Sequence, residues 1–259
     1  MKKGKTYILI GKKMNEFYEF DPPKEGDEPQ LPPLFSCQSV AQGKDPFDKA
    51  VASASSGDVG TVFYSNDSDT LSLAITLGPE VERSHALQVH YVMMLGLSDA
   101  LGALAPPEIE IAHLWPNLIF MNRGLMGKTI LLDAGGDVNK VPEWMVVGVK
   151  LRLKVESKKL HDKIELTSLE DEGASFLSNI RIIEAIARHF LSWLNKWQDE
   201  GFKPVHSTWS ERVVEKIFVK DALDNFSGTW IGLDDKGSAL FKSNEQHFSK
   251  SIIDVDLSK

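Results

Sequence analysis

The chain has 259 residues, of which 42% are hydrophobic and 25% are charged, so it can bury a sizeable core without covalent cross-links. The 37 Asp and Glu residues outnumber the 29 Lys and Arg residues, and the net charge of −8 disfavours general binding to nucleic-acid phosphates. The single cysteine, Cys37, excludes an internal disulfide framework and a multi-cysteine metal site, and it suits a reducing compartment.

The N-terminal region carries no targeting or membrane signal. The apolar stretch 7–10 is shorter than the ~7–15 residues of a signal-peptide core, and no apolar run reaches the ~18 residues that span a bilayer. Residues 15–33 are acidic and rich in proline, which predicts an extended lead-in over residues 1–33 that has no core of its own. We therefore expect a cytoplasmic protein with no membrane segment and no N-terminal DNA-binding domain.

A short helix and a hairpin are predicted next. Asp45-Pro46 is typical of a helix start, and small and apolar residues alternate over 46–55. Two runs rich in β-branched and aromatic residues, Val59–Ser65 and Leu71–Leu77, are separated by the turn residues 66–69. This pattern predicts a β-hairpin.

The middle of the chain alternates between helical and strand patterns. Apolar residues at three- and four-residue spacings predict one helix over Glu80–Leu104 and a second over Gly173–Trp197, ended by Gly201. Between the two helices, a polar loop or flap is expected at 154–172. Four short apolar runs that precede it predict strands of one sheet: Ile109–Ala112, Leu118–Met121, Thr129–Leu132 and Met145–Leu153.

The C-terminal tail, 212–259, has a different pattern. Strand-like runs occur at Ile217–Val219, Thr229–Leu233 and Ala239–Phe241, with turn residues 234–237 between the last two. We therefore predict an α+β fold in which the lead-in 1–33 precedes a domain over 34–205, and a small β-barrel-like domain follows over 206–259.

General rules identify no catalytic constellation. Gly127-Lys128-Thr129 resembles the end of a phosphate-binding P-loop, but position 122 is Asn122 instead of glycine and a strand follows instead of a helix. The seven histidines do not pair at metal-ligand spacing, so no metal site is expected. Cys37 has no nucleophile signature around it.

One segment carries a family resemblance. Trp115-Pro116-Asn117 resembles the K-W-P-N-D strand of biotin protein ligases, and other features follow in the family's order. Gly57–Ser65 is similar to the second half of the ligase glycine-arginine loop, and Gly228–Asp234 is similar to the pattern of the ligase C-terminal barrel. The resemblance covers about residues 34–259 and implies a diverged member of the biotin/lipoate protein ligase superfamily.

The resemblance implies a chemistry and its partners. Such ligases activate biotin or lipoate with ATP and Mg²⁺ to an acyl-adenylate, and then transfer the acyl group to a lysine of a carrier-protein domain. The implied pocket lies where Gly57–Ser65 approaches Trp115–Leu118. Its implied ligand-binding residues are Gly57, Asp58, Gly60, Phe63, Ser65, Trp115, Asn117, Gly127 and Gly148.

The sequence departs from the family where cations act on the reacting phosphate. The loop arginines are replaced by Ser56, Asp58, Val59 and Thr61, and the catalytic lysine falls at Leu125. Lys128 lies three residues on and needs a β-bulge to face the same side, while Arg152 occupies the position of a strand asparagine. Lys128 and Arg152 are therefore the catalytic candidates, clustered with Lys150 on adjacent predicted strands.

Two functional hypotheses follow. The chain is either an acyl-adenylate-forming ligase or acyltransferase with a rearranged site, or a ligand- or partner-binding homologue that keeps the fold without the chemistry. A lipoyl transferase with a Cys-Lys pair is a third reading, but Cys37 lies before the glycine segment, away from the position that such a nucleophile occupies. Because several electrostatic groups are missing together, we expect no efficient ordinary biotin ligation.

Overall fold

A computed structural model describes residues 28–155, 159–161, 164–214, 229–243 and 246–257. The expected lead-in therefore lies largely outside the described residues, as does the predicted strand Ile217–Val219. The helices are α1 (Pro46–Ala54), α2 (Arg83–Ala86), α3 (Val89–Leu104), α4 (Asn179–Glu200), α5 (Phe202–Glu211) and the 3-10 turn η2 (Ile252–Asp254).

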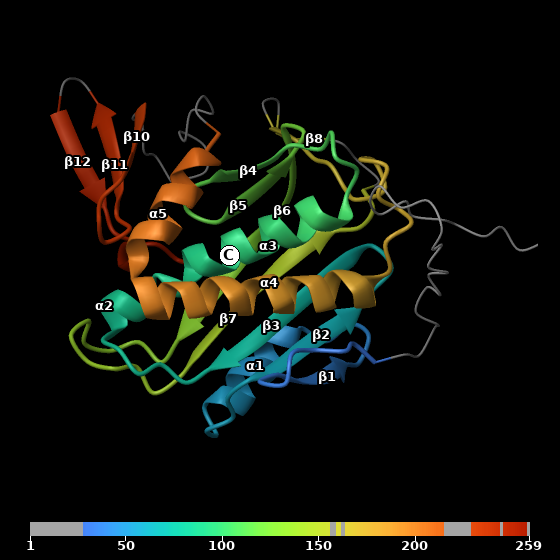
Figure 1. The fold of residues 1–259 in the computed structure, drawn as a ribbon, viewed down its shortest axis with the longest axis horizontal. Helices are drawn as coiled ribbons and strands as arrows, with labels where there is room; N and C mark the ends of the chain where they lie inside the picture. Colours follow the sequence, from blue (N-terminus) through green and yellow to red (C-terminus); the bar gives the residue numbers. More distant parts are fainter. Residues whose placement is uncertain (1–27, 156–158, 162–163, 215–228, 244–245, 258–259) are drawn as a thin grey trace, which may run out of the picture.

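The main sheet has seven strands in the order β1-β2-β3-β7-β6-β5-β4 (Figure 1). Strand β1 runs parallel to β2, and the other neighbouring pairs are antiparallel. The strands are β1 (Ser36–Val40), β2 (Thr61–Asn66), β3 (Thr70–Leu77), β4 (Ile111–Leu114), β5 (Leu118–Met121), β6 (Gly124–Asp133) and β7 (Met145–Arg152).

Two smaller sheets complete the described strands. Strands β8 (Lys159–His161) and β9 (Ile164–Glu165) form a two-stranded ladder within the region expected to be a loop. Near the C-terminus, β10 (Thr229–Leu233), β11 (Ala239–Ser243) and β12 (Gln246–Lys250) form an antiparallel three-stranded sheet. The predicted α+β class is confirmed, and the C-terminal strands that the structure describes form an open sheet instead of a closed barrel.

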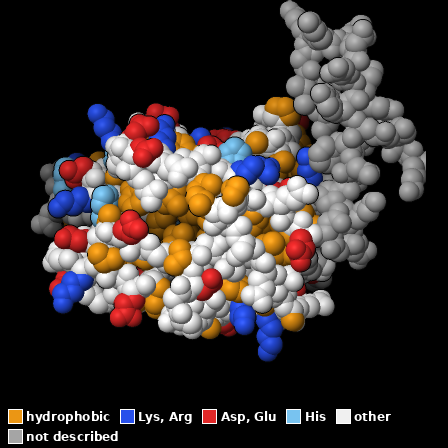
Figure 2. All heavy atoms as spheres, turned by 60° about the horizontal axis from the view of Figure 1, so that its bottom comes forward, with side chains coloured by type: hydrophobic (Ala, Val, Ile, Leu, Met, Phe, Trp, Pro, Cys, Tyr) orange, Lys and Arg blue, Asp and Glu red, His pale blue; other side chains and the backbone are white. Residues whose placement is uncertain are grey.

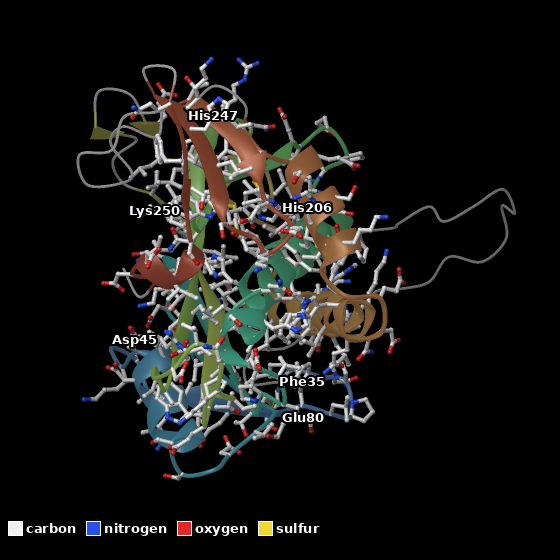
Figure 3. The ribbon with its side chains drawn as sticks, turned by 90° about the vertical axis from the view of Figure 1, so that its left-hand side faces the viewer. Phe35, Asp45, Glu80, His206, His247 and Lys250 are labelled. Carbon is white, nitrogen blue, oxygen red and sulfur yellow. The ribbon has the colours of Figure 1, made fainter. Side chains whose placement is uncertain are left out.

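The two faces of the main sheet carry different helices, as Figure 3 shows with the sheet nearly edge-on. On one face, α1 packs on β2, β3 and β7 through a small apolar cluster that includes Phe47, Phe63 and Ile130. The other face carries α3 and α4 and the larger core. Buried residues alternate between the two clusters along β2, where Val62 and Tyr64 belong to the larger core and Phe63 to the smaller one. This alternation is what the period of two in a strand dictates.

The long apolar helix of the sequence is a core helix. The stretch Arg83–Leu104 is long and apolar enough to cross a membrane, yet 78% of its most apolar window is buried inside the protein. Gly96 of α3 lies against the Phe190 backbone of α4, where a Cβ atom on the glycine would come within 2.7 Å of Cα. The two helices therefore pack in close contact, as small residues permit.

Several predicted boundaries differ from the structure. The helix expected over Glu80–Leu104 is broken into α2 and α3, and the helix expected from Gly173 begins at Asn179. The side chain of Ser178 caps this later start by accepting a hydrogen bond from the Arg181 backbone N–H at 3.4 Å, and it thereby satisfies a free donor of the first turn. Gly201 ends α4 as predicted, with a φ of 76°.

Gly148 controls how closely α1 approaches the sheet. A Cβ atom on Gly148 would lie 2.0 Å from the Leu73 carbonyl oxygen and 2.8 Å from Cζ of the Phe47 ring. The absent side chain is therefore what lets the ring lie directly on the strand. The sequence marks Gly148 as a candidate ligand-binding residue; in the structure it packs beneath α1.

We expect Gly148→Ala to lower the free energy of unfolding by at least about 1–3 kcal/mol, because the added methyl group overpacks backbone and ring atoms that cannot both move away. Gly102→Ala is the matched control: it lies in α3 with nothing within 4 Å of the place that the added methyl group would take, so helix propensity raises stability there by about 0.5–1 kcal/mol. Urea unfolding of both variants measures the contrast, and equal effects of the two substitutions would contradict this account.

A second contact joins the C-terminal sheet to the main domain. The Tyr91 hydroxyl donates to the Gly237 carbonyl at 2.5 Å and accepts from Nε1 of Trp115 at 3.0 Å. Trp115 and Trp230 each pack edge-on against Phe241 of β11. The described C-terminal strands are thus attached by aromatic packing and by a two-bond hydrogen-bonded chain.

Tyr91→Phe keeps the ring but leaves the indole N–H and the Gly237 carbonyl without this partner, at a cost of about 1–3 kcal/mol for each buried group. We expect lower global stability and faster proteolytic cleavage between the main domain and β10, read by limited proteolysis with mass spectrometry. Unchanged cleavage in Tyr91→Phe would show that aromatic packing alone holds the sheet.

Candidate functional site

Strands β6 and β7 place three cationic side chains around one pocket on the α1 face of the sheet. Lys128 of β6 pairs directly with Lys150 of β7, and residues paired in this way point to the same face. Arg152 follows two residues after Lys150 and shares its face. The pocket has a volume of about 240 Å³ and is lined by Thr70, Leu118, Leu125, Gly127, Lys128, Lys150 and Arg152. We call it the basic pocket.

A β-bulge brings Lys128 to this pocket. The pairing of β5 with β6 shifts between Ile119 opposite Gly127 and Phe120 opposite Leu125, so Met126 is an extra residue on β6. Leu125 and Lys128 are three residues apart, yet both line the basic pocket. The bulge required by the sequence analysis is therefore present, and Lys128 lies beside the position where the family's lysine falls.

Two of the three cations have partners in the protein. Nζ of Lys150 lies 2.6 Å from a carboxylate oxygen of Asp45, the residue that caps α1, and 5.4 Å from the centre of the Phe47 ring. Nη1 of Arg152 donates to the Leu125 carbonyl oxygen at 3.2 Å. These contacts hold two cationic groups at the pocket wall.

Lys128 is the cation whose environment opposes its charge. Burial lowers the pKa of its ammonium group, and the charges of Lys150 and Arg152 lower this pKa further, while Asp256 and Asp45 act in the opposite direction. Burial also lowers the pKa of Arg152. A cluster of desolvated cations attracts an anion, so the basic pocket is suited to a carboxylate or to a single phosphate group.

A second pocket adjoins the basic one. It has a volume of about 480 Å³ and shares Thr70 and Arg152 with the basic pocket. Its other walls carry the acidic groups Asp69, Glu170 and Asp171. The combined site is therefore cationic at its inner end and mixed in charge where it opens outward.

The segment that resembles the glycine-arginine loop lies elsewhere. Gly57, Asp58 and Gly60 precede β2, at the end of the sheet where Thr61 begins its strand, whereas the basic pocket includes Thr70 at the opposite end of β3. The Asp58 carboxylate accepts hydrogen bonds from Ser53, Thr61 and Thr76 at 2.9, 2.9 and 3.3 Å. Asp58 thus closes a turn, and the structure does not bring it to the cations.

The connection that does border the basic pocket is short. Strands β2 and β3 are joined by residues 67–69, of which Asp67 and Asp69 are acidic. Three residues form a tight turn and cannot fold over a ligand on the sheet. This geometry fits a ligand with one or two negative charges, and it does not supply the enclosing cations that a triphosphate needs.

Two further candidates lie beneath α1 or next to it. Phe63 is 1% exposed and packs in the α1 cluster, so it is a core residue. Ser65 is buried and pairs with Ser72, which in turn pairs with Lys150. Its hydroxyl has no hydrogen-bond partner among the described residues. Ser65 thus shares a row and a face with the cations, two strands away from Lys150.

The Trp115-Pro116-Asn117 segment makes buried structural contacts beside the basic pocket. The Trp115 ring is fully buried, and a cis peptide bond joins it to Pro116, whose carbonyl lies 2.9 Å from Nε2 of His90. The Asn117 side chain donates to the Thr129 carbonyl at 3.1 Å. Burial lowers the pKa of His90 to about 4, so this imidazole is neutral at physiological pH. The next residue, Leu118, reaches the basic pocket.

Trp115 and Phe63, the predicted apolar walls of a pocket between Gly57–Ser65 and Trp115–Leu118, belong to cores on opposite faces of the sheet. Of the nine ligand-binding candidates, Gly127 lines the basic pocket, together with both catalytic candidates. Sequence reasoning missed Thr70, although its place at the start of a predicted strand next to the hairpin turn was a usable signal. Among the described residues, no group of three His, Cys, Asp or Glu side chains is placed to hold a metal ion.

Two known proteins have sequences similar to this chain. The sequence is 23% identical over 172 residues to a biotin–[acetyl-CoA-carboxylase] ligase of Paracoccus denitrificans, a match that covers 65% of this chain and 72% of that protein. It is 20% identical over 197 residues to the bifunctional ligase/repressor BirA of Bacillus subtilis, which covers 74% of this chain and 59% of that protein.

Two solved structures resemble the structure of this chain. A biotin protein ligase-like protein of unknown function from Silicibacter sp. superposes with a TM-score of 0.78 at 29% identity, over 87% of this chain and 97% of that one. The biotin protein ligase of Aquifex aeolicus superposes with a TM-score of 0.66 at 16% identity, over 83% and 95% of the two chains, and it shares the fold. Residues 31–211 match the sequence model of the Biotin/lipoate A/B protein ligase family, and this chain belongs to that family.

Proposed function

We propose that this protein binds a small carboxylic acid of the biotin, lipoate or octanoate type in the basic pocket, and that it does so without efficient ATP-dependent ligation. The observation that supports this most directly is the convergence of Lys128, Lys150 and Arg152 on one pocket. In that pocket the ligand carboxylate meets the cations, and the apolar side chains of Leu118 and Leu125 contact its hydrocarbon part.

The ligand class follows from size and charge. A volume of about 240 Å³ accepts a short acyl chain or a small ring, and the neighbouring space of about 480 Å³ accepts whatever extends from it. Hydrogen bonds from charged donors to a carboxylate are the strong kind and contribute about 1.5–3 kcal/mol each. One such contact from Lys128 is therefore enough to define specificity for acids over the corresponding alcohols.

The proposed lack of efficient adenylation rests on what surrounds the pocket. An adenylating site stabilises charge that develops on phosphoryl oxygens, and the loss of one preorganised group typically costs about 10²–10³ in rate. Here the connection between β2 and β3 is a short turn with two aspartates, and the glycine segment with Asp58 lies at the other end of these strands. The biotin protein ligase of Aquifex aeolicus is known in complex with biotin and ATP. By resemblance, the loop arginines of such ligases are replaced in this chain by Ser56, Asp58, Val59 and Thr61.

A second candidate function is ATP-dependent transfer of the acid to a lysine of a carrier-protein domain. The observation that favours it is the bulge at Met126, which places Lys128 next to the position where the family's lysine falls. In that case Lys128 would stabilise the reacting carboxylate and phosphate, and ATP with Mg²⁺ would supply the activation.

Isothermal titration calorimetry with octanoate, lipoate and biotin tests the binding proposal. We expect at least one acid to bind, and Lys128→Gln to weaken it by about tenfold or more because a charged hydrogen bond is lost. Lys49→Gln removes the same charge from the exposed surface of α1 and is expected to leave the affinity unchanged. If none of the three acids binds, or if both variants behave alike, the proposal is wrong.

ATP–pyrophosphate exchange with the same three acids separates the two candidates. Binding without exchange above background supports the non-ligating function. Robust exchange that Lys128→Gln abolishes supports the second candidate and contradicts the first.

Lys128 also carries a prediction for stability. Its pKa in the folded protein lies below its usual value near 10.5, so at neutral pH the charged form favours the unfolded chain. The penalty is present below the folded pKa and disappears as the pH rises through the unfolded value. Lys128→Met should therefore raise the free energy of unfolding at pH 7, by up to about 1 kcal/mol at this partly exposed position.

Urea denaturation at pH 7 and near pH 10.5 measures this gain, which should shrink at the higher pH and in added salt. Lys49→Met provides the comparison on a solvent-exposed helix surface. A lower urea midpoint of unfolding for Lys128→Met at pH 7 would mean that the charged Lys128 stabilises the fold. The cations of the basic pocket would then not destabilise one another.

A further inference from the structure

A larger cleft lies on the opposite face of the main sheet, between the C-terminal half of α4 and the ends of β2 and β3. Its volume is about 640 Å³, within the range of small-molecule sites. Hydrophobic side chains gather around a hollow on the side of the molecule shown in Figure 2. The apolar members of the lining are Leu34, Phe35, Val59, Leu77, Pro79, Val81, Ala86, Val89, Met145, Leu191, Leu194 and Trp197.

One wall of the cleft is held by specific contacts. Gly60 has a φ of +84°, and a Cβ atom there would lie 2.8 Å from the Leu34 carbonyl oxygen, so only glycine lets this segment approach. The Gln30 backbone N–H donates to the Glu184 side chain of α4 at 2.8 Å, and the Phe35 ring stacks on Phe190 at 6.4 Å. The segment that carries Leu34 and Phe35 is thereby anchored to α4, and the cleft is preformed.

The floor is aromatic, and the indole N–H of Trp197 already has a partner in the protein. Nε1 of Trp197 donates to Oε1 of Gln88 at 3.0 Å, and the His85 ring packs edge-on against the indole at 5.2 Å. Both Trp197 and His85 line the cleft. The Trp197 ring is thus fixed in the floor of the cleft, where it is 8% exposed.

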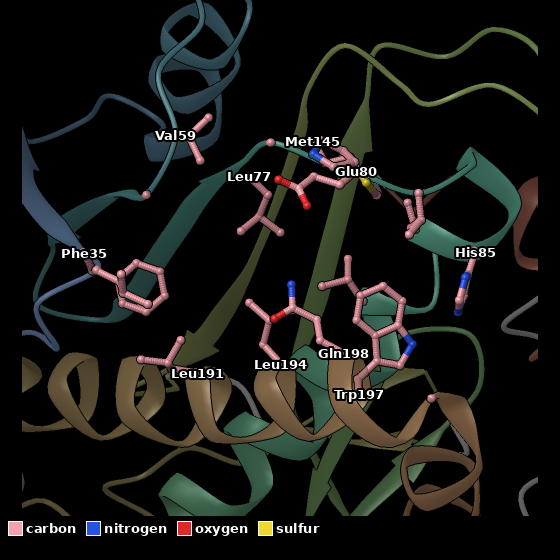
Figure 4. A pocket seen from close by; sticks show the side chains of 18 residues that line it. Phe35, Val59, Leu77, Glu80, His85, Met145, Leu191, Leu194, Trp197 and Gln198 are labelled. Atoms are coloured by element: carbon pink, nitrogen blue, oxygen red, sulfur yellow. The ribbon is translucent and has the colours of Figure 1, made fainter.

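The polar groups of the cleft set its charge preference. Glu80 and Gln198 extend toward the same space from opposite walls, as Figure 4 shows. No lysine or arginine lines the cleft among the described residues. The nearby Arg83 is engaged with Asp133 at 3.0 Å. A ligand therefore meets one carboxylate, one carboxamide, the His85 imidazole at the floor and a wide apolar surface.

We propose that this cleft binds an elongated apolar molecule that ends in a protonated amine. The amine pairs with Glu80 and donates to the carboxamide oxygen of Gln198, and the hydrocarbon part lies on Trp197 and the leucines of α4. A carboxylic acid of the same length meets repulsion from Glu80. The charge preference is opposite to that of the basic pocket, and the two sites lie on opposite faces, so this inference does not rest on the proposed function.

The test uses the full chain and three probes with the same carbon chain: decylamine, decanol and decanoate, each below its micelle concentration. Titration calorimetry should show that decylamine binds about tenfold more tightly than decanoate, with decanol between them, since attraction and repulsion at an exposed carboxylate are each worth a few-fold. The result that overturns the proposal is absence of decylamine binding, or equal affinity for amine and acid.

Substitutions in the cleft, each compared with a control outside it, test whether decylamine binds there. Glu80→Gln should reduce the amine-over-acid preference at least threefold, whereas Glu82→Gln, two residues away and outside the cleft, should leave it unchanged. Leu194→Lys places a cation on the half-buried α4 wall and should weaken decylamine at least tenfold, while Lys128→Gln should have no effect on it. If Glu80→Gln keeps the full preference, or Leu194→Lys keeps the full affinity, the amine binds elsewhere and the assignment is wrong.

Discussion

The hydroxyl group of Tyr91 is the contact on which the arrangement of this molecule depends. It lies fully buried on α3, accepts from Trp115 in the segment between β4 and β5, and donates to the Gly237 carbonyl in the turn between β10 and β11. Gly237 has a φ of +93°, and a Cβ atom there would approach the tyrosine ring to 2.9 Å. One phenol therefore joins the core helix, the main sheet and the C-terminal sheet, and each donor or acceptor in the chain satisfies the next.

This contact gives the Trp115-Pro116-Asn117 segment a structural role. Trp115 is needed for the attachment of the C-terminal sheet, and Pro116 presents its carbonyl to the buried His90. Replacing the fully buried Trp115 with a small residue would leave a cavity beside Phe241, at a cost of about 3–5 kcal/mol. Leu118, by contrast, is partly buried: it packs against the larger core and also borders the basic pocket.

The elements that the sequence predicted are those whose signal is local. The strand Leu118–Met121 and the strand Thr229–Leu233 have the predicted bounds, because an apolar run between turn residues determines each of them. The cluster of Lys128, Lys150 and Arg152 was also predictable, since neighbouring antiparallel strands bring such positions together. Strand β1 was missed because its sequence, Ser-Cys-Gln-Ser-Val, shows no clear apolar alternation and is stabilised by parallel pairing with β2.

The parts that sequence reasoning missed depend on register and on distant contacts. Gly57 and Gly60 match a loop pattern locally, but they precede Thr61 at the end of β2 that lies far from the cations. Strand β2 then runs toward the cations, and the connection that reaches them is the acidic turn 67–69. Nothing near Asp58 in the sequence indicates its bond to Thr76, which is eighteen residues away. The residues that line the apolar cleft come from separate segments between Leu34 and Gly201, so no single stretch of the sequence indicates this cleft.

The central sheet itself keeps the two pockets chemically apart. Alternate residues of β7 point to opposite faces: Lys150 and Arg152 reach the basic pocket, while Met145, Val147 and Val149 belong to the larger core, and Met145 lines the apolar cleft. A charge on one face is thus separated from the other by a layer of backbone and buried side chains. The two sites also lie at opposite ends of β3, because the basic pocket includes Thr70 at its start and the apolar cleft includes Leu77 at its end. Occupancy of one site therefore changes the field at the other only weakly, and coupling between them requires movement of the sheet or of α4 instead of direct electrostatics.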